Sequence, residues 1–166
     1  MKTLCETVAE QIFANFRNLE TAIRTYDRNA PVCDVPAWRY VYHTLYSADR
    51  WFFNPFIYEE PVFHDAIPNN PDQPNTAILS DEELLDILKN VEQKTYDYLS
   101  KLTDQDLYER PPECTFTRME LILIQFRHMS FHTGMLNGQT VERTGKFPVY
   151  ISPHTAERLE RGLYDE

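Results

Sequence analysis

Segments with apolar side chains at helical spacing constrain this chain more than any other feature. In residues 4–27 the apolar positions lie three or four residues apart: Val8, Ile12, Phe16, Leu19, Ile23 and Tyr26. Residues 81–102 repeat the pattern, after a capping box of Ser80 and Glu83, with Leu84, Leu88, Val91, Thr95, Tyr98 and Leu102. Because an α-helix has 3.6 residues per turn, each set lies on one face, which is typical of an amphipathic helix packed on a core.

A third helix is expected over residues 36–53, and it differs in being aromatic on almost every side. Pro36 stands in its first turn, where the missing N–H is tolerated, and Pro55 follows its end. Buried surroundings on more than one face would explain the aromatic side chains. Residues 54–79, with five prolines and no helical period, are expected to form a long connection. Its first half is apolar, and we expect it to pack as a lid or flap over one end of the bundle.

The last long helix is expected to begin at Thr117. Thr117 and Glu120 have the spacing of a capping box, and a nearly unbroken apolar run follows, as in a core helix or one that also makes a subunit contact. The helix should reach at least Leu136. Its end is expected between Asn137 and Gly145, because glycines weaken this stretch.

These elements predict an all-α fold, an antiparallel four-helix bundle with a long connection between helices 2 and 3. A short C-terminal helix is expected from about 154 to 162. The length of 166 residues suits one domain spanning 1–166. Simple up-down-up-down order is favoured, but the unequal connections leave the order open.

Composition excludes several classes of partner. The net charge of −10 opposes binding to nucleic acid and to anionic membrane surfaces. No apolar run approaches the roughly 20 residues of a membrane helix, and acidic residues near the N-terminus do not fit an export signal. The three cysteines are widely spaced and odd in number, which is typical of reduced thiols. From the cysteines and the lack of a visible export signal, we expect a cytoplasmic protein.

Histidines provide the strongest candidate for chemistry. His128 and His132 are four residues apart on the last long helix, so both imidazoles project from one face and have the spacing for a shared transition metal. A zincin helix would have Glu between its histidines, and Met129-Ser130-Phe131 stands here instead, so that interpretation fails. His43, in the middle of the second helix, is a third candidate ligand. The alternative for each is a histidine that forms only structural hydrogen bonds.

A mid-helix histidine followed 85 residues later by a His-x-x-x-His pair resembles the DinB-like superfamily, also described as DinB/YfiT-like metal-dependent hydrolases. The local resemblance lies in Tyr42-His43, in Asp49-Arg50-Trp51, and in the segment Gln-Phe-Arg-His-Met-Ser-Phe-His-Thr-Gly at 125–134. Helix order, the long connection and the overall length extend it over nearly the whole chain. One departure is visible: the family often has Gly-Gln after the last histidine, whereas Met135 follows Gly134 here.

The resemblance implies that His43, His128 and His132 bind one divalent metal at one end of the core. It also implies a homodimer, and an activity similar to that of transferases and isomerases that use a low-molecular-weight thiol such as mycothiol or bacillithiol. Zinc, nickel and iron all accept imidazole, so the ligand type does not choose among them; we expect zinc or nickel, with iron as a further option. Such a metal would lower the pKa of a bound water to about 7 or bind a thiolate.

The other polar residues near His43 have weaker signals. Tyr46 and Ser47 share its helix face and are candidates for substrate binding, with ordinary core packing as the alternative. Asp49 lies about 120° from that face, so no general base is identified. His64 and His154 are expected at the surface, although the alternative for His64 is a position over the mouth of the bundle.

The sequence alone leaves two functions open. The first is a metal-dependent hydrolase or thiol-group transferase, in which the three histidines hold the metal and aromatic walls bind a small-molecule substrate. The alternative is a non-catalytic dimeric helical bundle that binds a small ligand or a partner protein. Metal content distinguishes the two.

Overall fold

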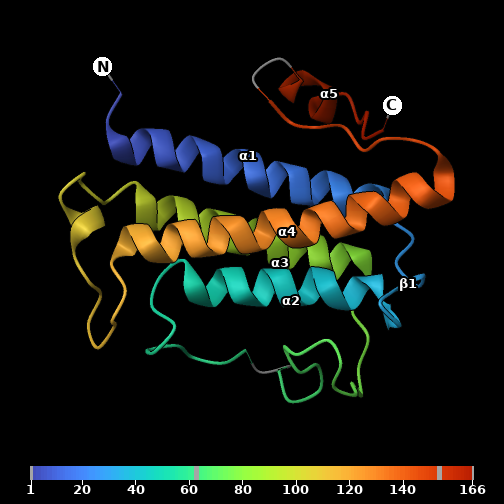
Figure 1. The fold of residues 1–166 in the computed structure, drawn as a ribbon, viewed down its shortest axis with the longest axis horizontal. Helices are drawn as coiled ribbons and strands as arrows, with labels where there is room; N and C mark the ends of the chain where they lie inside the picture. Colours follow the sequence, from blue (N-terminus) through green and yellow to red (C-terminus); the bar gives the residue numbers. More distant parts are fainter. Residues whose placement is uncertain (1, 62–63, 153–154, 166) are drawn as a thin grey trace.

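A computed structural model describes residues 2–61, 64–152 and 155–165 of the chain (Figure 1). It is mainly helical, as expected. The elements in order are α1 (Leu4–Thr25), β1 (Pro31–Val32), β2 (Val35–Pro36), α2 (Ala37–Trp51), α3 (Asp81–Leu99), the 3-10 helix η1 (Asp106–Tyr108), α4 (Arg118–Thr144) and α5 (Ala156–Glu160).

The helix boundaries follow local signals in the sequence. Both expected capping boxes are present, at Ser80 with Glu83 and at Thr117 with Glu120. The last long helix ends at Thr144, because Gly145 adopts the left-handed conformation (φ 71°) that favours glycine at a helix end. This end lies within the predicted interval.

A small hairpin between α1 and α2 was not expected. Strands β1 and β2 pair antiparallel, with Val32 opposite Val35, and the turn residues Cys33 and Asp34 both have positive φ. Two residues per strand are too few to show an alternating pattern, which is why the sequence did not predict it.

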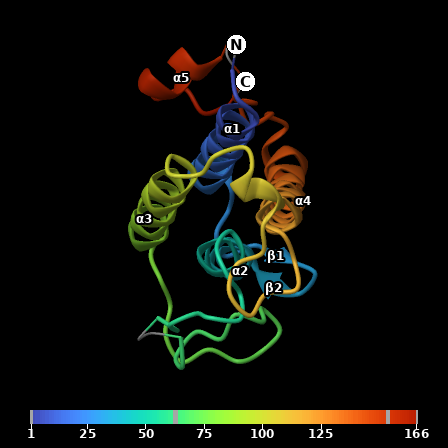
Figure 2. The ribbon, with the colours of Figure 1, turned by 90° about the vertical axis from the view of Figure 1, so that its left-hand side faces the viewer.

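The four long helices pack around one core. Helix α1 contacts α3 and α4, and α2 contacts the same two helices, so α1 and α2 lie diagonally opposite each other (Figure 2). The fully buried side chains at the centre come from all four helices, and examples are Phe16, Leu45, Leu88 and Leu136. None of the described helices is sufficiently long and apolar to cross a bilayer.

The helix directions correct the favoured up-down-up-down order. Helices α1 and α4 run one way, and α2 and α3 run the other way (Figure 1). Lys94 pairs with Asp49 at 2.6 Å, and the ring of Tyr98 contacts that of Phe53, so rising residue numbers advance together along α2 and α3. Parallel neighbours need a connection that returns along the whole helix, and residues 52–80 provide it.

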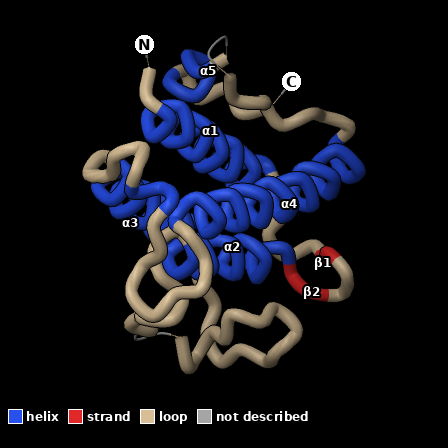
Figure 3. Tube along the Cα trace, turned by 60° about the vertical axis from the view of Figure 1, so that its left-hand side comes forward, coloured by secondary structure: helices blue, strands red, loops and turns tan. Residues whose placement is uncertain are grey.

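That long connection lies along α2, on the side away from α1 (Figure 3). Arg39 of α2 is 1% exposed, and its Nη2 donates hydrogen bonds to the main-chain oxygens of Pro68, Asn70 and Gln73 at 2.8–3.1 Å. Ile67, which belongs to the same segment, is completely buried. The described part of the connection therefore packs along the side of α2, and not over an end of the bundle as expected.

The C-terminal segment packs against α1 on the other side of the molecule (Figure 1). The Asn18 side chain accepts a hydrogen bond from the Ile151 main chain at 2.8 Å, and Arg24 lies 5.0 Å from the ring centre of Tyr164. The short helix expected here is α5, although residues 153–154, and with them His154, lie outside the described residues.

Truncation of a core leucine tests this packing. Leu136→Ala, at a fully buried position of α4, should lower the free energy of unfolding by about 2–5 kcal/mol, because it removes buried methyl groups and leaves a cavity. Leu123→Ala on the same helix removes a side chain that is 53% exposed and should cost less than about 0.5 kcal/mol. Urea unfolding measures both values, and equal losses would contradict the described core.

Candidate metal centre

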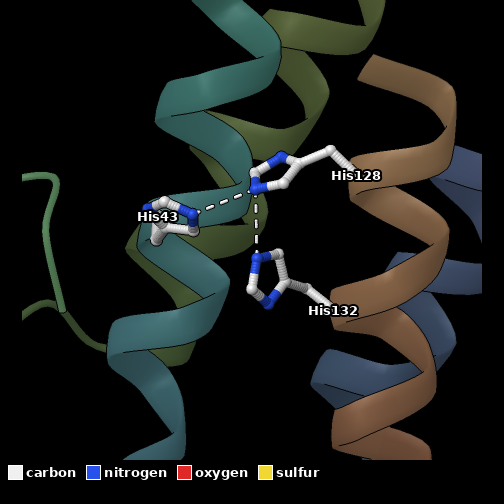
Figure 4. A group of neighbouring side chains, drawn as sticks. All are labelled: His43, His128 and His132. Atoms are coloured by element: carbon white, nitrogen blue, oxygen red, sulfur yellow. Dashed lines mark hydrogen bonds between the residues drawn. The ribbon is translucent and has the colours of Figure 1, made fainter. Parts of the chain in front are cut away.

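The antiparallel neighbours α2 and α4 bring the three predicted ligands together. His43 comes from α2, and His128 and His132 come from successive turns of α4 (Figure 4). His128 Nε2 lies 3.0 Å from His43 Nε2 and 3.0 Å from His132 Nε2. One ligand atom from each residue lies within 4.8 Å of the other two. The three imidazoles therefore face a common point.

The hydrogen bonds of His43 decide which of its nitrogens faces the cluster. Its Nδ1 lies 2.9 Å from the main-chain oxygen of Asn69 and 3.0 Å from the Asn69 side-chain oxygen. Because a carbonyl oxygen can only accept, Nδ1 must carry the donated hydrogen. Nε2 is left to offer its lone pair toward His128 and His132. A metal-binding histidine commonly has such an outer hydrogen bond, which orients the ring.

Burial keeps the two histidines of α4 uncharged at neutral pH. Burial, and to a smaller extent repulsion from the nearby His43, together lower the pKa of His128 to about 4. Burial, with smaller contributions from His128 and His43, lowers the pKa of His132 to about 3. Neutral imidazole is the form that binds a transition metal. No carboxylate or thiolate joins the group among the described residues.

The geometry fits one cation of transition-metal size. Ligand nitrogens about 2.0–2.1 Å from a metal, at angles of 90–110°, lie about 2.9–3.4 Å from each other. Two separations of 3.0 Å match this range. Without a cation, His128 Nε2 carries at most one hydrogen, so its two 3.0 Å contacts cannot both be well-formed hydrogen bonds and one of them is repulsive. A bound cation removes that repulsion.

The three histidines lie beside a cavity of about 520 Å³, a size suited to a small molecule. His43 and His128 form part of its wall. The remaining lining residues are Ser47, Trp51, Asn69, Ile124, Gln125, Arg127 and Phe131. Ser47, a predicted substrate-binding residue, therefore lies in the wall next to the cluster.

Tyr46, the other predicted substrate-binding residue, faces a different set of groups. Its hydroxyl donates to Glu60, and its ring stacks on His64 with centres 4.7 Å apart. His64 is half-buried and also lies 3.4 Å from the Tyr42 hydroxyl. Tyr46 is not among the residues that line the cavity. The substrate-binding role of Tyr46 and Ser47 stays a prediction.

Asp49 does not face the histidines. It accepts a hydrogen bond from the Tyr58 hydroxyl at 2.8 Å and pairs with Lys94 at 2.6 Å. Its position off the face of His43 agrees with the helical geometry, and its partners tie the long connection and α3 to α2.

Asn69, Gln125 and Arg127 belong to the site, and the sequence did not predict them. Asn69 lies in a proline-rich connection without periodicity, and only the hydrogen bonds of Arg39 to the neighbouring residues bring it to His43. Gln125 and Arg127 had a usable signal. They lie three residues and one residue before His128, on the helix that carries the paired histidines.

Loss of the Arg39 side chain is expected to lower the stability of the protein more than loss of the Asn69 side chain. Arg39→Met leaves three carbonyl oxygens without their donor and should lower the free energy of unfolding by about 1–3 kcal/mol. Asn69→Ala keeps the main-chain oxygen that accepts from His43, so it should cost less than about 1 kcal/mol. Urea unfolding compares the two, and a larger loss for Asn69→Ala would contradict this account.

No family model matches the chain, and neither a curated protein nor a solved structure matches it. Support for a function therefore comes from the geometry of the site and from the resemblance of its histidine pattern to the DinB-like superfamily.

Proposed function

We propose that this protein is a metal-dependent enzyme of the DinB-like type, with the four long helices forming its four-helix bundle. In this proposal it acts as a hydrolase or as a thiol-group transferase on a small molecule. The observation that supports it best is the convergence of His43, His128 and His132 on one point, with Nε2 separations of 3.0 Å. Two of the three imidazoles are held neutral by burial.

The metal would be zinc or nickel, with iron as a further option, because all three accept imidazole. When bound, it would supply a Lewis acid that activates water or a low-molecular-weight thiol at an open position, since three neutral ligands leave its full charge in place. His43, His128 and His132 would hold it. The Asn69 carbonyl keeps the His43 ring oriented through Nδ1.

The remaining walls would bind and shield the substrate. Trp51, Ile124 and Phe131 present apolar surface to the cavity, and Ser47 presents a hydroxyl. Apolar walls lower the local dielectric and strengthen electrostatic interactions with the reacting group. The described lining contains no carboxylate that could act as a general base.

Metal content tests the proposal directly. Protein purified without an affinity tag or added metal should contain about one transition-metal ion per chain by elemental analysis. His132→Ala should lower the content to background because it removes one ligand of three. His64→Ala removes a histidine outside the cluster and should keep the metal. A chelator should lower the melting temperature of the wild type but not that of His132→Ala, because bound metal stabilises only the folded state.

An unchanged metal content and melting temperature in His132→Ala would refute the metal site. The alternative function, a non-catalytic helical bundle that binds a small ligand, would then be the better explanation.

A further inference from the structure

The lining of the cavity has a charge opposite to that of the whole protein. The chain has 26 acidic and 16 basic side chains, yet no Asp or Glu is among the residues that line the cavity. The one charged side chain in this lining is Arg127. The cavity is thus locally positive, even before a divalent cation is added at the histidines.

Arg127 is exposed and forms no ion pair with any residue of the described ranges. By contrast, Arg50 on α2 is paired with Glu60 at 3.3 Å. A guanidinium has five N–H donors in a planar fork that matches a carboxylate. Arg127 therefore offers an unused anion-binding group at the edge of the cavity.

Apolar side chains flank Arg127 on the same face of α4. Ile124 lies three residues before it and Phe131 four residues after it, and both line the cavity. Trp51 lines the same cavity from α2. A ligand whose charge reaches Arg127 can therefore place an apolar body against these three side chains.

Gln125 adds a buried donor to the lining. The residue is 1% exposed, and its side-chain nitrogen has no hydrogen-bond partner among the described residues. A buried N–H without a partner is unfavourable, and a ligand oxygen would satisfy it. Arg127 and Gln125 thus each add a donor to the lining of the cavity.

We infer that the cavity binds a small organic carboxylate with an apolar body, and that Arg127 binds its carboxylate group. The inference rests on the proposed function, because it places the reacting end of that molecule at His43, His128 and His132. A carboxylate fits better than a phosphate monoester, since one arginine can match its two oxygens whereas a dianion calls for more donors. A cationic ligand would meet Arg127 and the metal as like charges.

A matched pair of probes tests the inference. Isothermal titration calorimetry on zinc-loaded protein would compare 4-phenylbutyrate with 4-phenylbutyramide, which has nearly the same shape and no charge. The wild type should bind the carboxylate more tightly than the amide. Arg127→Gln should weaken carboxylate binding about tenfold or more and leave amide binding unchanged, because only the charge-assisted bond is lost.

Arg110→Gln is the matched control, since Arg110 is also exposed but does not line the cavity. It changes the net charge equally and should alter carboxylate binding less than about twofold. Elemental analysis of each sample separates the two claims. If the protein has its full metal content but Arg127→Gln binds the carboxylate as tightly as the wild type does, the inference is overturned and the proposed function is unaffected.

Three further outcomes would overturn the inference: equal affinity for carboxylate and amide, no binding of either probe, or carboxylate binding abolished by a chelator yet unaffected by Arg127→Gln. The last result would place the carboxylate on the metal. If the wild type holds no metal but binds the carboxylate through Arg127, the enzyme proposal fails and the anion site remains.

Discussion

The antiparallel contact between α2 and α4 is the feature on which the candidate site depends. Two histidines four residues apart on one helix provide only two ligands of a metal site, so the third nitrogen has to come from a neighbouring helix. Helix α2 supplies His43 at the level of His128, 3.0 Å away. A shift of one helical turn between the helices, about 5.4 Å, would separate these nitrogens beyond the reach of any single ion.

The long connection between α2 and α3 also contributes to the arrangement of the site. It carries the chain back along α2, so that α3 runs parallel to α2, and it places Asn69 beside His43. The buried Arg39 holds this segment through three main-chain oxygens. The desolvation of that arginine is unfavourable, and the hydrogen bonds offset it. One buried side chain of α2 thus links the course of the connection to the ring orientation of a histidine one turn away.

The long helices and the position of His128 and His132 on one helix face could be predicted from the sequence because both follow from local periodicity. The grouping of His43 with that pair came from the resemblance, since no local period relates residues on different helices. Capping boxes marked the starts of α3 and α4, and the spacing of His128 and His132 set both on one face of α4. The helix order was wrong because it depends on the path of the connection, which has no period to interpret. Asn69 was missed for the same reason: its place beside His43 comes from hydrogen bonds made between segments distant in the sequence.

Charge shows how a site can differ from the molecule around it. An excess of ten negative charges opposes polyanionic partners, because their many phosphates would meet the whole surface. A small anion meets only the cavity, where local groups dominate because the walls are apolar and bulk charges are screened beyond about 10 Å. Within the described part of the chain Arg127 has no ion-pair partner and no carboxylate lines the cavity, so the local field favours negative charge. Net charge therefore argues against polyanionic macromolecules but not against the small carboxylate that we propose as ligand.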